Sequence, residues 1–205
     1  MNPNLIALII VISLLGGNEK KAPSITTVIS TIDILSYNIP DTTVNKSELF
    51  YNIKNSSWTL NDELYSGYAV SFYPKKNLKE KFGILNGKTQ NQAIQWFSDG
   101  HYKYLANYHK GKLHGEKKSW STDSIHILVS HLKYVNGKPH GEQKKYYPTG
   151  ELFKKLNLNM GKEEGLQQAF RKNGALYANY EAREGRIFGL KKSKLCFQLD
   201  DEEVQ

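Results

Sequence analysis

The sequence predicts an all-β protein, an elongated meander of stacked β-hairpins that starts with a β-rich N-terminal cap. Three observations carry this prediction. A glycine-rich turn motif returns at a nearly constant interval, one aromatic position recurs in phase with it, and apolar and polar residues alternate on the segment before each turn. A repeat of about two dozen residues indicates an array in which each unit stacks on its neighbour.

The N-terminus has the pattern of an export signal. An apolar run extends from Leu5 to Leu15, which is too short to span a bilayer but suits a secretory signal peptide. The next residues resemble a lipoprotein cleavage box, with Gly17 where the lipidated cysteine belongs. We therefore expect a signal peptide over residues 1–17, a tether over 18–24 and an exported protein of the periplasm or membrane-associated cell envelope. A cytoplasmic location is the alternative.

Residues 25–59 are expected to form the cap. β-branched residues dominate from Ile25 to Leu35 and predict a strand, whereas polar residues indicate a loop from Tyr37 to Ser47. Short strands are expected around Leu49–Ile53 and Trp58–Leu60. Such a cap would cover the unpaired backbone at the end of a stacked sheet.

Five repeats are expected over residues 60–195. Each carries Gly-Lys or Gly-Arg and, four residues after that glycine, a closing residue at position 91, 115, 141, 165 or 189. Gly67 stands in phase before the first of these, so the steps from 67 onward are 24, 24, 26, 24 and 24. The closing residues are Gly67, Gly115, Gly141, Gly165 and Gly189, with Asn91 in the weakest copy. Glycine supplies the positive φ of tight reversals. The closing glycine would also let the chain enter the strand beside an aromatic side chain.

One position of each repeat is always aromatic, and a turn follows it. These residues are Phe72, Trp96, Trp120, Tyr146 and Phe170. Asp99-Gly100 and Asn173-Gly174 indicate two-residue hairpin turns. The first copy has Asn77 in place of the glycine, and the third lacks the glycine at Asp123-Ser124 and carries two additional residues.

The return segment of each repeat alternates with a period of two. Five residues before the turn glycine stand Phe82, Ala106, Leu132, Leu156 and Tyr180, and three before it stand Ile84, Tyr108, Tyr134, Leu158 and Ala182. No large apolar residue separates the members of a pair. This pattern predicts a strand with one buried face, and we expect the aromatic column to interdigitate with such pairs.

The repeats resemble the MORN-repeat variant of bacterial proteins. The resemblance is carried by Trp96–Gly100 with Tyr108–Gly115, and by Tyr147–Gly150 with Met160–Gly165. It covers about residues 60–195. Chains of this family are commonly classed as YwqK-type antitoxins and sometimes as membrane-binding proteins. The resemblance implies a single-layer meander of hairpins and a binding role rather than chemistry.

The charge distribution suggests candidate binding residues. The net charge is +8, while the repeats carry 24 Lys and Arg against 12 Asp and Glu, which favours anionic partners or membrane surfaces. The residue after each turn glycine is basic, giving the row Lys88, Lys112, Lys138, Lys162 and Arg186. This row is a candidate ladder for an acidic partner. Exposed turn charges that serve solubility are the alternative.

No catalytic motif, cofactor site or metal site is expected. His114 and His140 occupy equivalent turn positions without a recurring acidic or cysteine ligand beside them. The single cysteine, Cys196, excludes an intrachain disulfide and is the first residue of an acidic tail over residues 196–205.

We therefore expect a non-enzymatic scaffold of the bacterial cell envelope that binds a protein or other macromolecule through its sheet. One alternative is a cytoplasmic antitoxin that neutralises a toxin by direct contact. Another is binding to an anionic membrane surface through the basic turns. Export argues against nucleic acid, and no small-molecule substrate is expected.

Overall fold

The computed structural model describes residues 37–190. The expected signal peptide, the tether, the strand over Ile25–Leu35 and the acidic tail lie outside this range. Within it, no helix has the length and apolar character needed to cross a membrane.

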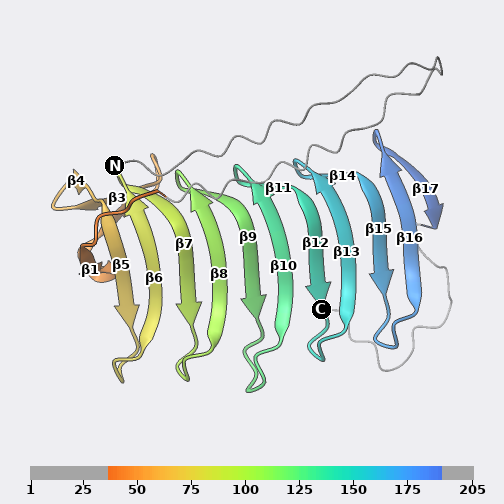
Figure 1. Ribbon diagram of the computed structural model, residues 1–205, viewed down its shortest axis with the longest axis horizontal. Coiled ribbons are helices and arrows are strands. Elements are labelled where there is room, and N and C mark those ends of the chain that lie inside the picture. Colours follow the sequence, from red (N-terminus) through yellow and green to blue (C-terminus); the bar gives the residue numbers. More distant parts are fainter. Residues whose placement is uncertain (1–36, 191–205) are drawn as a thin grey trace, which may run out of the picture. The chain divides into compact units, whose positions relative to one another are not determined.

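The described chain is all-β, as predicted, and consists mainly of one long meander of sequential hairpins (Figure 1). The main sheet has 14 strands and the small sheet three. The main path is antiparallel except where β1 pairs in parallel with β5. The strands of the main sheet are β1 (Thr43–Asn45), β5 (Gly67–Phe72), β6 (Leu78–Leu85), β7 (Lys88–Trp96), β8 (Tyr102–His109), β9 (Lys112–Trp120), β10 (Leu128–Val135), β11 (Lys138–Pro139), β12 (Gly141–Tyr146), β13 (Leu152–Asn159), β14 (Lys162–Glu163), β15 (Gly165–Phe170), β16 (Leu176–Arg183) and β17 (Arg186–Leu190).

The Gly-Lys motifs form the tight turns at one end of the strands. In each turn, both central residues have positive φ, as in Asn136-Gly137 at 49° and 82°, which is the conformation of a type I′ hairpin. In three of these turns the glycine N–H also donates to the carbonyl two residues after the glycine of the preceding turn, as from Gly137 to Leu113 at 2.7 Å. Successive turns are therefore hydrogen-bonded to one another along the sheet edge.

The loops at the other end are longer than expected. Gly100 N–H donates to the Phe97 carbonyl, and Phe97 N–H donates to the His101 carbonyl. This is a three-residue loop whose last residue, Gly100, has a φ of 92°, so the prediction of a two-residue turn at Asp99-Gly100 was wrong. In the first repeat Lys76, not Asn77, has the positive φ, at 65°.

Four of the six closing residues lie at irregularities in strand pairing, namely Asn91, Gly115, Gly141 and Gly165. Phe82 pairs with Ala93 and the next residue pairs with Gln90, so the register skips two residues, including Asn91. Asn91 has a φ of 59° and Gly141 a φ of 79°. A left-handed backbone at a bulge therefore explains these closing residues. Gly67 differs, because it pairs regularly with Ile84 and a Cβ there would clash with the Tyr65 hydroxyl, which agrees with the expected passage beside an aromatic side chain.

At two of these bulges, buried glutamine side chains take the place of the missing main-chain hydrogen bonds between strands. Gln167 Nε2 donates to the Asn157 carbonyl at 2.7 Å, and its Oε1 accepts from Asn157 N–H at 3.1 Å. Gln143 makes the same two contacts with Lys133 one repeat earlier. Both glutamine side chains are buried, and their amides satisfy backbone groups that the bulge leaves unpaired.

The two faces of the main sheet differ in chemistry. The register places Phe82, Ala93, Ala106 and Leu132 on one face, which we call the capped face. The predicted return-strand pairs lie there, which confirms their period-two pattern. The opposite face, the charged face, carries ion pairs such as Lys144 Nζ with Glu142 Oε1 at 2.7 Å.

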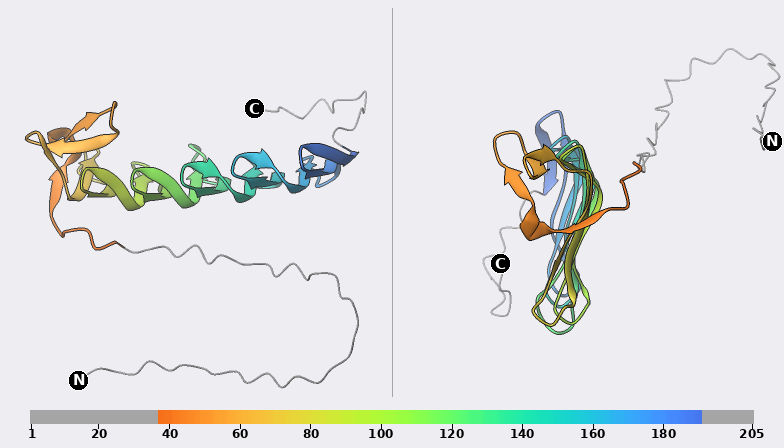
Figure 2. Two further views of the ribbon diagram at one scale, coloured as in Figure 1. Left: turned by 90° about the horizontal axis from the view of Figure 1, so that it is seen from above. Right: turned by 90° about the vertical axis from the view of Figure 1, so that its left-hand side faces the viewer.

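A small sheet covers the N-terminal part of the capped face (Figure 2). It consists of β2 (Phe50–Asn52), β3 (Ser57–Leu60) and β4 (Glu63–Leu64), close to the two short strands expected there. The ring centroids of Trp58 and Phe82 are 5.2 Å apart, and Tyr65 belongs to the same buried cluster. The segment expected as a loop over Tyr37–Ser47 instead contains β1 and the start of a 3₁₀ helix, η1 (Lys46–Glu48).

The aromatic column is partly buried. Trp96 and Trp120 lie on either side of Tyr102, with ring centroids 6.2 Å and 5.8 Å from it. The aromatic side chains therefore interdigitate with the first residue of a return strand, not with the expected pairs such as Leu132 and Tyr134. Phe72, at the start of the column, is 50 % exposed.

Candidate functional site

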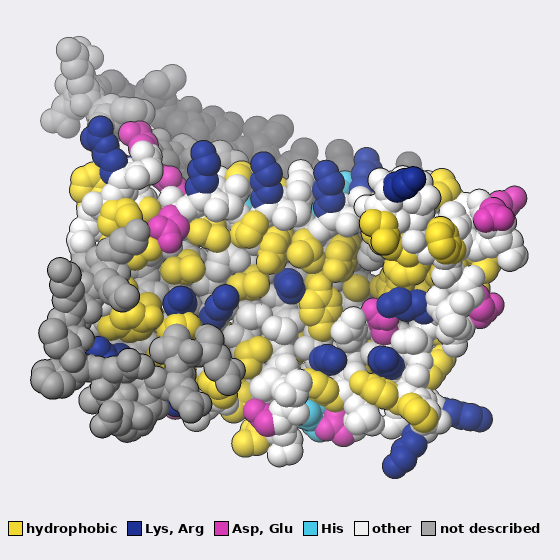
Figure 3. Space-filling view, turned by 180° about the vertical axis from the view of Figure 1, so that it is seen from behind, with side chains coloured by type: hydrophobic (Ala, Val, Ile, Leu, Met, Phe, Trp, Pro, Cys, Tyr) yellow, Lys and Arg dark blue, Asp and Glu magenta, His cyan; other side chains and the backbone are white. Residues whose placement is uncertain are grey.

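The predicted basic row lies along the edge formed by the type I′ turns. Figure 3 shows Lys and Arg side chains along this edge. The aliphatic stem of Lys88 lies beside Gly111, and that of Lys112 lies beside Gly137. The row is thus spaced by the turn-to-turn stacking, one basic residue per repeat.

Lys88 differs from the other members of this row. Its ammonium group donates to the Ser56 carbonyl at 3.1 Å and also to the Asn55 carbonyl. Lys88 therefore holds the loop between β2 and β3 of the cap, while Lys112, Lys138, Lys162 and Arg186 are exposed. The structure brings four of the five predicted residues together as an exposed row.

An apolar band lies on the capped face next to this row (Figure 3). We define the apolar band as Tyr108, Leu113, Tyr134, Pro139 and Leu158. Their pairing partners place them on the face that carries Ile84, Leu132 and Leu156. All five side chains are half-buried. Lys117 also lies on this face and places its ammonium 5.5 Å from the Tyr104 ring centroid.

A groove joins the cap to the apolar band. Its volume is about 270 Å³, and its lining includes Trp58 and Tyr51 from the small sheet and Phe82, Tyr104 and Tyr108 from the main sheet. Tyr104 and Tyr108 share a hydrogen bond of 3.0 Å between their hydroxyl groups. The buried contact between cap and sheet therefore continues as an open surface.

The charged face has its charges largely paired. Glu142 accepts from Lys144 at 2.7 Å and lies 3.2 Å from Lys155. The hydrogen bond from Lys144 is the main reason why the pKa of Glu142 lies below its ordinary value, and the contact with Lys155 adds to the effect. Glu116 makes the equivalent pair of contacts one repeat earlier. The charged face therefore offers fewer uncompensated cations than the exposed basic row.

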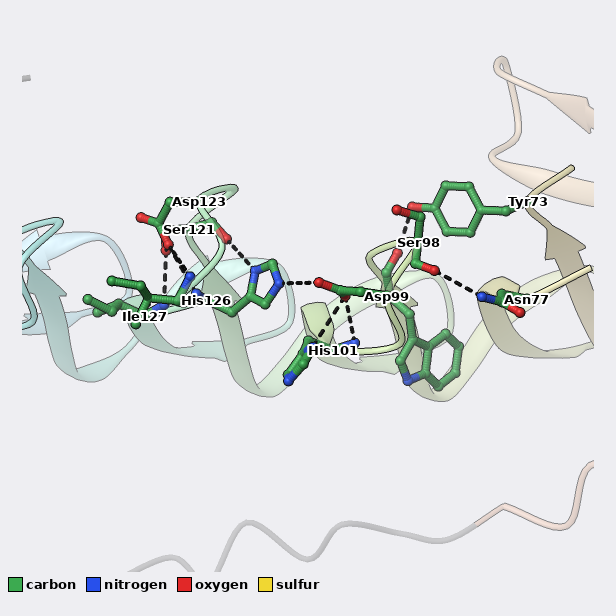
Figure 4. A network of polar contacts seen from close by, with 11 residues as sticks. Tyr73, Asn77, Ser98, Asp99, His101, Ser121, Asp123, His126 and Ile127 are labelled. Carbon is green, nitrogen blue, oxygen red and sulfur yellow. Dashed lines mark hydrogen bonds and ion pairs between the residues drawn. The ribbon is translucent and has the colours of Figure 1, made fainter. Parts of the chain in front are cut away.

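A second group of polar residues connects three successive loops at the other end of the strands (Figure 4). The Asn77 amide donates to the Ser98 carbonyl at 2.9 Å. His126 Nε2 lies 2.6 Å from Asp99 Oδ2, and His101 Nδ1 lies 3.3 Å from Asp99 Oδ1. One carboxylate thus stands between two imidazoles from adjacent repeats.

The position of His126 is set by its own loop. His126 has a φ of 51°, and its N–H donates to Asp123 Oδ1 at 3.0 Å. The same carboxylate oxygen accepts from Ile125 N–H and the Ser121 hydroxyl. The ring stacks on Phe97, with a centroid distance of 4.5 Å and an interplanar angle of 17°. The His126 side chain is therefore held in one place and is only 8 % exposed.

The electrostatics of this cluster follow from the contact between Asp99 and His126. The hydrogen bond to His126 lowers the pKa of Asp99 to about 2. The same contact raises the pKa of His126 above its ordinary value. His126 Nδ1 lies 3.3 Å from the Ser121 carbonyl. Because both ring nitrogens have partners, neither is placed to remove a proton from a substrate.

Sequence reasoning did not anticipate this cluster. It treated Asp99 as a turn residue and did not single out His101 or His126. The available signal was the two-residue enlargement of the third repeat, because that loop contains His126. The histidines that were considered, His114 and His140, lie at the opposite ends of the strands, where His114 Nδ1 is 3.3 Å from Asn136 Oδ1.

The architecture and surfaces define a β-hairpin meander of repeat-like units with one partly covered face. No protein-family model matches the sequence. No curated protein matches it at a significant level.

Proposed function

We propose that this chain is a non-enzymatic, MORN-like repeat scaffold of the cell envelope that binds another protein on the capped face. The observation that carries the proposal is the continuity of one apolar surface. Trp58 packs on Phe82 under the cap, and the groove at Tyr108 leads to Tyr134 and Leu158. Among the described residues, the small sheet is the only second layer on this face.

Charge favours an acidic partner. The apolar band is bordered by the turn lysines on one side, and Lys117, Lys145 and Lys154 lie on the same face. A partner with apolar side chains and carboxylates would cover the band and neutralise these lysines. This arrangement supports a protein surface, either of an envelope protein or, for a cytoplasmic chain, of a toxin.

The test compares two variants that introduce the same charge on opposite faces. Leu132→Glu changes the capped face, directly across from Lys117, and Gln168→Glu changes the charged face. Affinity capture with the full-length protein is performed from envelope and cytosolic extracts of cells that produce it. We expect the wild type and Gln168→Glu to capture the same protein. The amount captured should fall by about tenfold or more with Leu132→Glu.

Circular dichroism of both variants checks that the sheet is retained. Capture that is unchanged by Leu132→Glu, or lost only with Gln168→Glu, contradicts binding on the capped face. A partner from the envelope extract supports an envelope scaffold, and a partner from the cytosolic extract supports a cytoplasmic antitoxin.

A further inference from the structure

We propose that Asp99, His101 and His126 form a binding site for a divalent transition-metal ion, with Zn²⁺ as the best fit. Their ligand atoms all lie within 4.8 Å of one another. Two imidazole nitrogens and one carboxylate favour Zn²⁺ and its neighbours in the first transition row, whereas Mg²⁺ and Ca²⁺ prefer ligands that are all oxygen. The site is separate from the apolar band, because it lies in the three-residue and enlarged loops at the other end of the strands.

The contacts of His126 direct one nitrogen at the site. Nδ1 faces the Ser121 carbonyl at 3.3 Å, so the hydrogen on this nitrogen donates to Ser121. A backbone carbonyl on the far nitrogen is the usual support of a metal-binding histidine. Nε2 then points to Asp99 Oδ2, 2.6 Å away. With the hydrogen on Nδ1, both Nε2 and the carboxylate oxygen present lone pairs. Such atoms approach this closely only when a proton or a metal ion lies between them.

Of the three ligands, His126 is held in place, whereas Asp99 and His101 can adjust to an ion. Phe97 and Asp123 fix the ring and backbone of His126. In a tetrahedral zinc site, neighbouring ligand atoms are about 3.4 Å apart, so Asp99 has to move by less than about 1 Å. The His101 side chain is 67 % exposed and can turn toward the ion. Water can supply a fourth ligand because Asp99 is half-exposed.

A bound ion would join the loop between β7 and β8 to the loop between β9 and β10. Asp99 and His101 belong to the first loop, and His126 belongs to the second. The ion would therefore act as a clip between successive repeats and add to the main-chain pairing of β8 with β9. No catalytic role is required for this effect.

The test is calorimetric titration of the untagged, chelator-treated full-length protein with Zn²⁺. We expect one equivalent to bind, with affinity weakened on the order of 100-fold by His126→Asn and by Asp99→Asn, and about tenfold by His101→Asn. The control is His114→Asn, which removes a histidine at the opposite ends of the strands and is expected to leave the affinity unchanged.

Co²⁺ provides an independent readout, because its visible absorption reports nitrogen and oxygen ligands and a low coordination number. We expect this absorption with the wild type and with His114→Asn, and its loss with His126→Asn. Circular dichroism shows whether each variant retains its sheet, and His101→Asn tests the site without altering the His126 loop. Absence of Zn²⁺ binding by the wild type, or equal binding by the His101→Asn/His126→Asn double variant, overturns the proposal.

Discussion

At the scale of single residues, the type I′ turns show how far this fold depends on backbone conformation. The first central residue of each turn has a φ between 48° and 50°, and the five residues in this position are Asn86, Lys110, Asn136, Met160 and Glu184. Asparagine tolerates the left-handed region much better than methionine, lysine or glutamate does. Three of the five turns therefore use a residue that is poorly suited to its conformation.

Replacing Met160 with Asn is expected to stabilise the protein. Met160 is 41 % exposed with a φ of 50°, so little packing is lost while the left-handed conformation becomes more favourable. We expect the free energy of unfolding to rise by about 0.5–1 kcal/mol. Urea denaturation followed by circular dichroism measures the change. The reciprocal variant, Asn136→Met, should lower stability by a similar amount, and an increase would refute the explanation.

At the scale of strands, pairing is reinforced by side chains that cross from one strand to the next. Glu142 on β12 contacts Lys155 on β13 as well as Lys144 on its own strand. The buried Gln167 on β15 pairs with the backbone of Asn157 on β13. These contacts hold the register of β13 against both of its neighbours, β12 and β15. A slip of one residue would move every side chain to the other face.

The contribution of Glu142 should depend on pH. Its pKa is lowered in the folded protein, so its carboxylate stabilises the fold above its ordinary pKa of about 4.3, and this stabilisation is lost as the pH falls through the lowered value. Since the pair is partly exposed, we expect Glu142→Gln to cost about 0.5 kcal/mol at pH 7. Thermal denaturation should show that the difference between the two proteins shrinks as the pH falls below about 4.3 and disappears below the lowered pKa of Glu142. A constant difference from pH 7 to pH 3 would exclude this ion-pair effect.

At the scale of the whole described chain, stability comes from contacts between neighbouring repeats. The pairing of β12 with β13 recurs in β15 with β16, with a register irregularity at the equivalent place. Gly141 and Gly165 have φ values of 79° and 81°. In such an array, each unit contributes through its own fold and its two neighbours.

Removal of one repeat should therefore be tolerated. We expect deletion of the 24 residues from Gly141 to Glu164 to leave a folded sheet, because Gln167 would then meet Lys133 in the position now taken by Gln143. Circular dichroism and a single cooperative unfolding transition measure this. Deletion of only residues 141–160 removes less than one full repeat, so the later turns no longer fall at the positions of the earlier ones. This deletion should unfold the chain. Equal behaviour of the two deletions would argue against a repeat-by-repeat fold.

Much of the candidate surface could be predicted from local patterns. Phe82, Leu132 and Leu156 were placed on one face because a strand alternates its side chains regardless of what surrounds it. The spacing of the turn lysines followed from the repeat length. Lys88 was the exception, because its contacts with the cap loop involve residues more than 30 positions away.

The cluster of Asp99, His101 and His126 could not be predicted from local patterns. The period indicates that a residue 24 positions after Asp99 lies in the neighbouring loop, but His126 is 27 positions away and lies in the enlarged loop. Its ring reaches Asp99 because Asp123 holds a left-handed backbone and Phe97 supports the ring. Neither contact has a signature in the local sequence.

By itself, the sequence determined the all-β class, the hairpin order and the apolar side of each return strand, since these depend on local alternation and on glycines that permit positive φ. Only the tertiary structure decided which face the cap covers, where Gln143 and Gln167 bridge the bulges, and that Asp99 meets His126. The physical reason is that these features depend on contacts between residues from different repeats, and such contacts exist only once the strands have stacked.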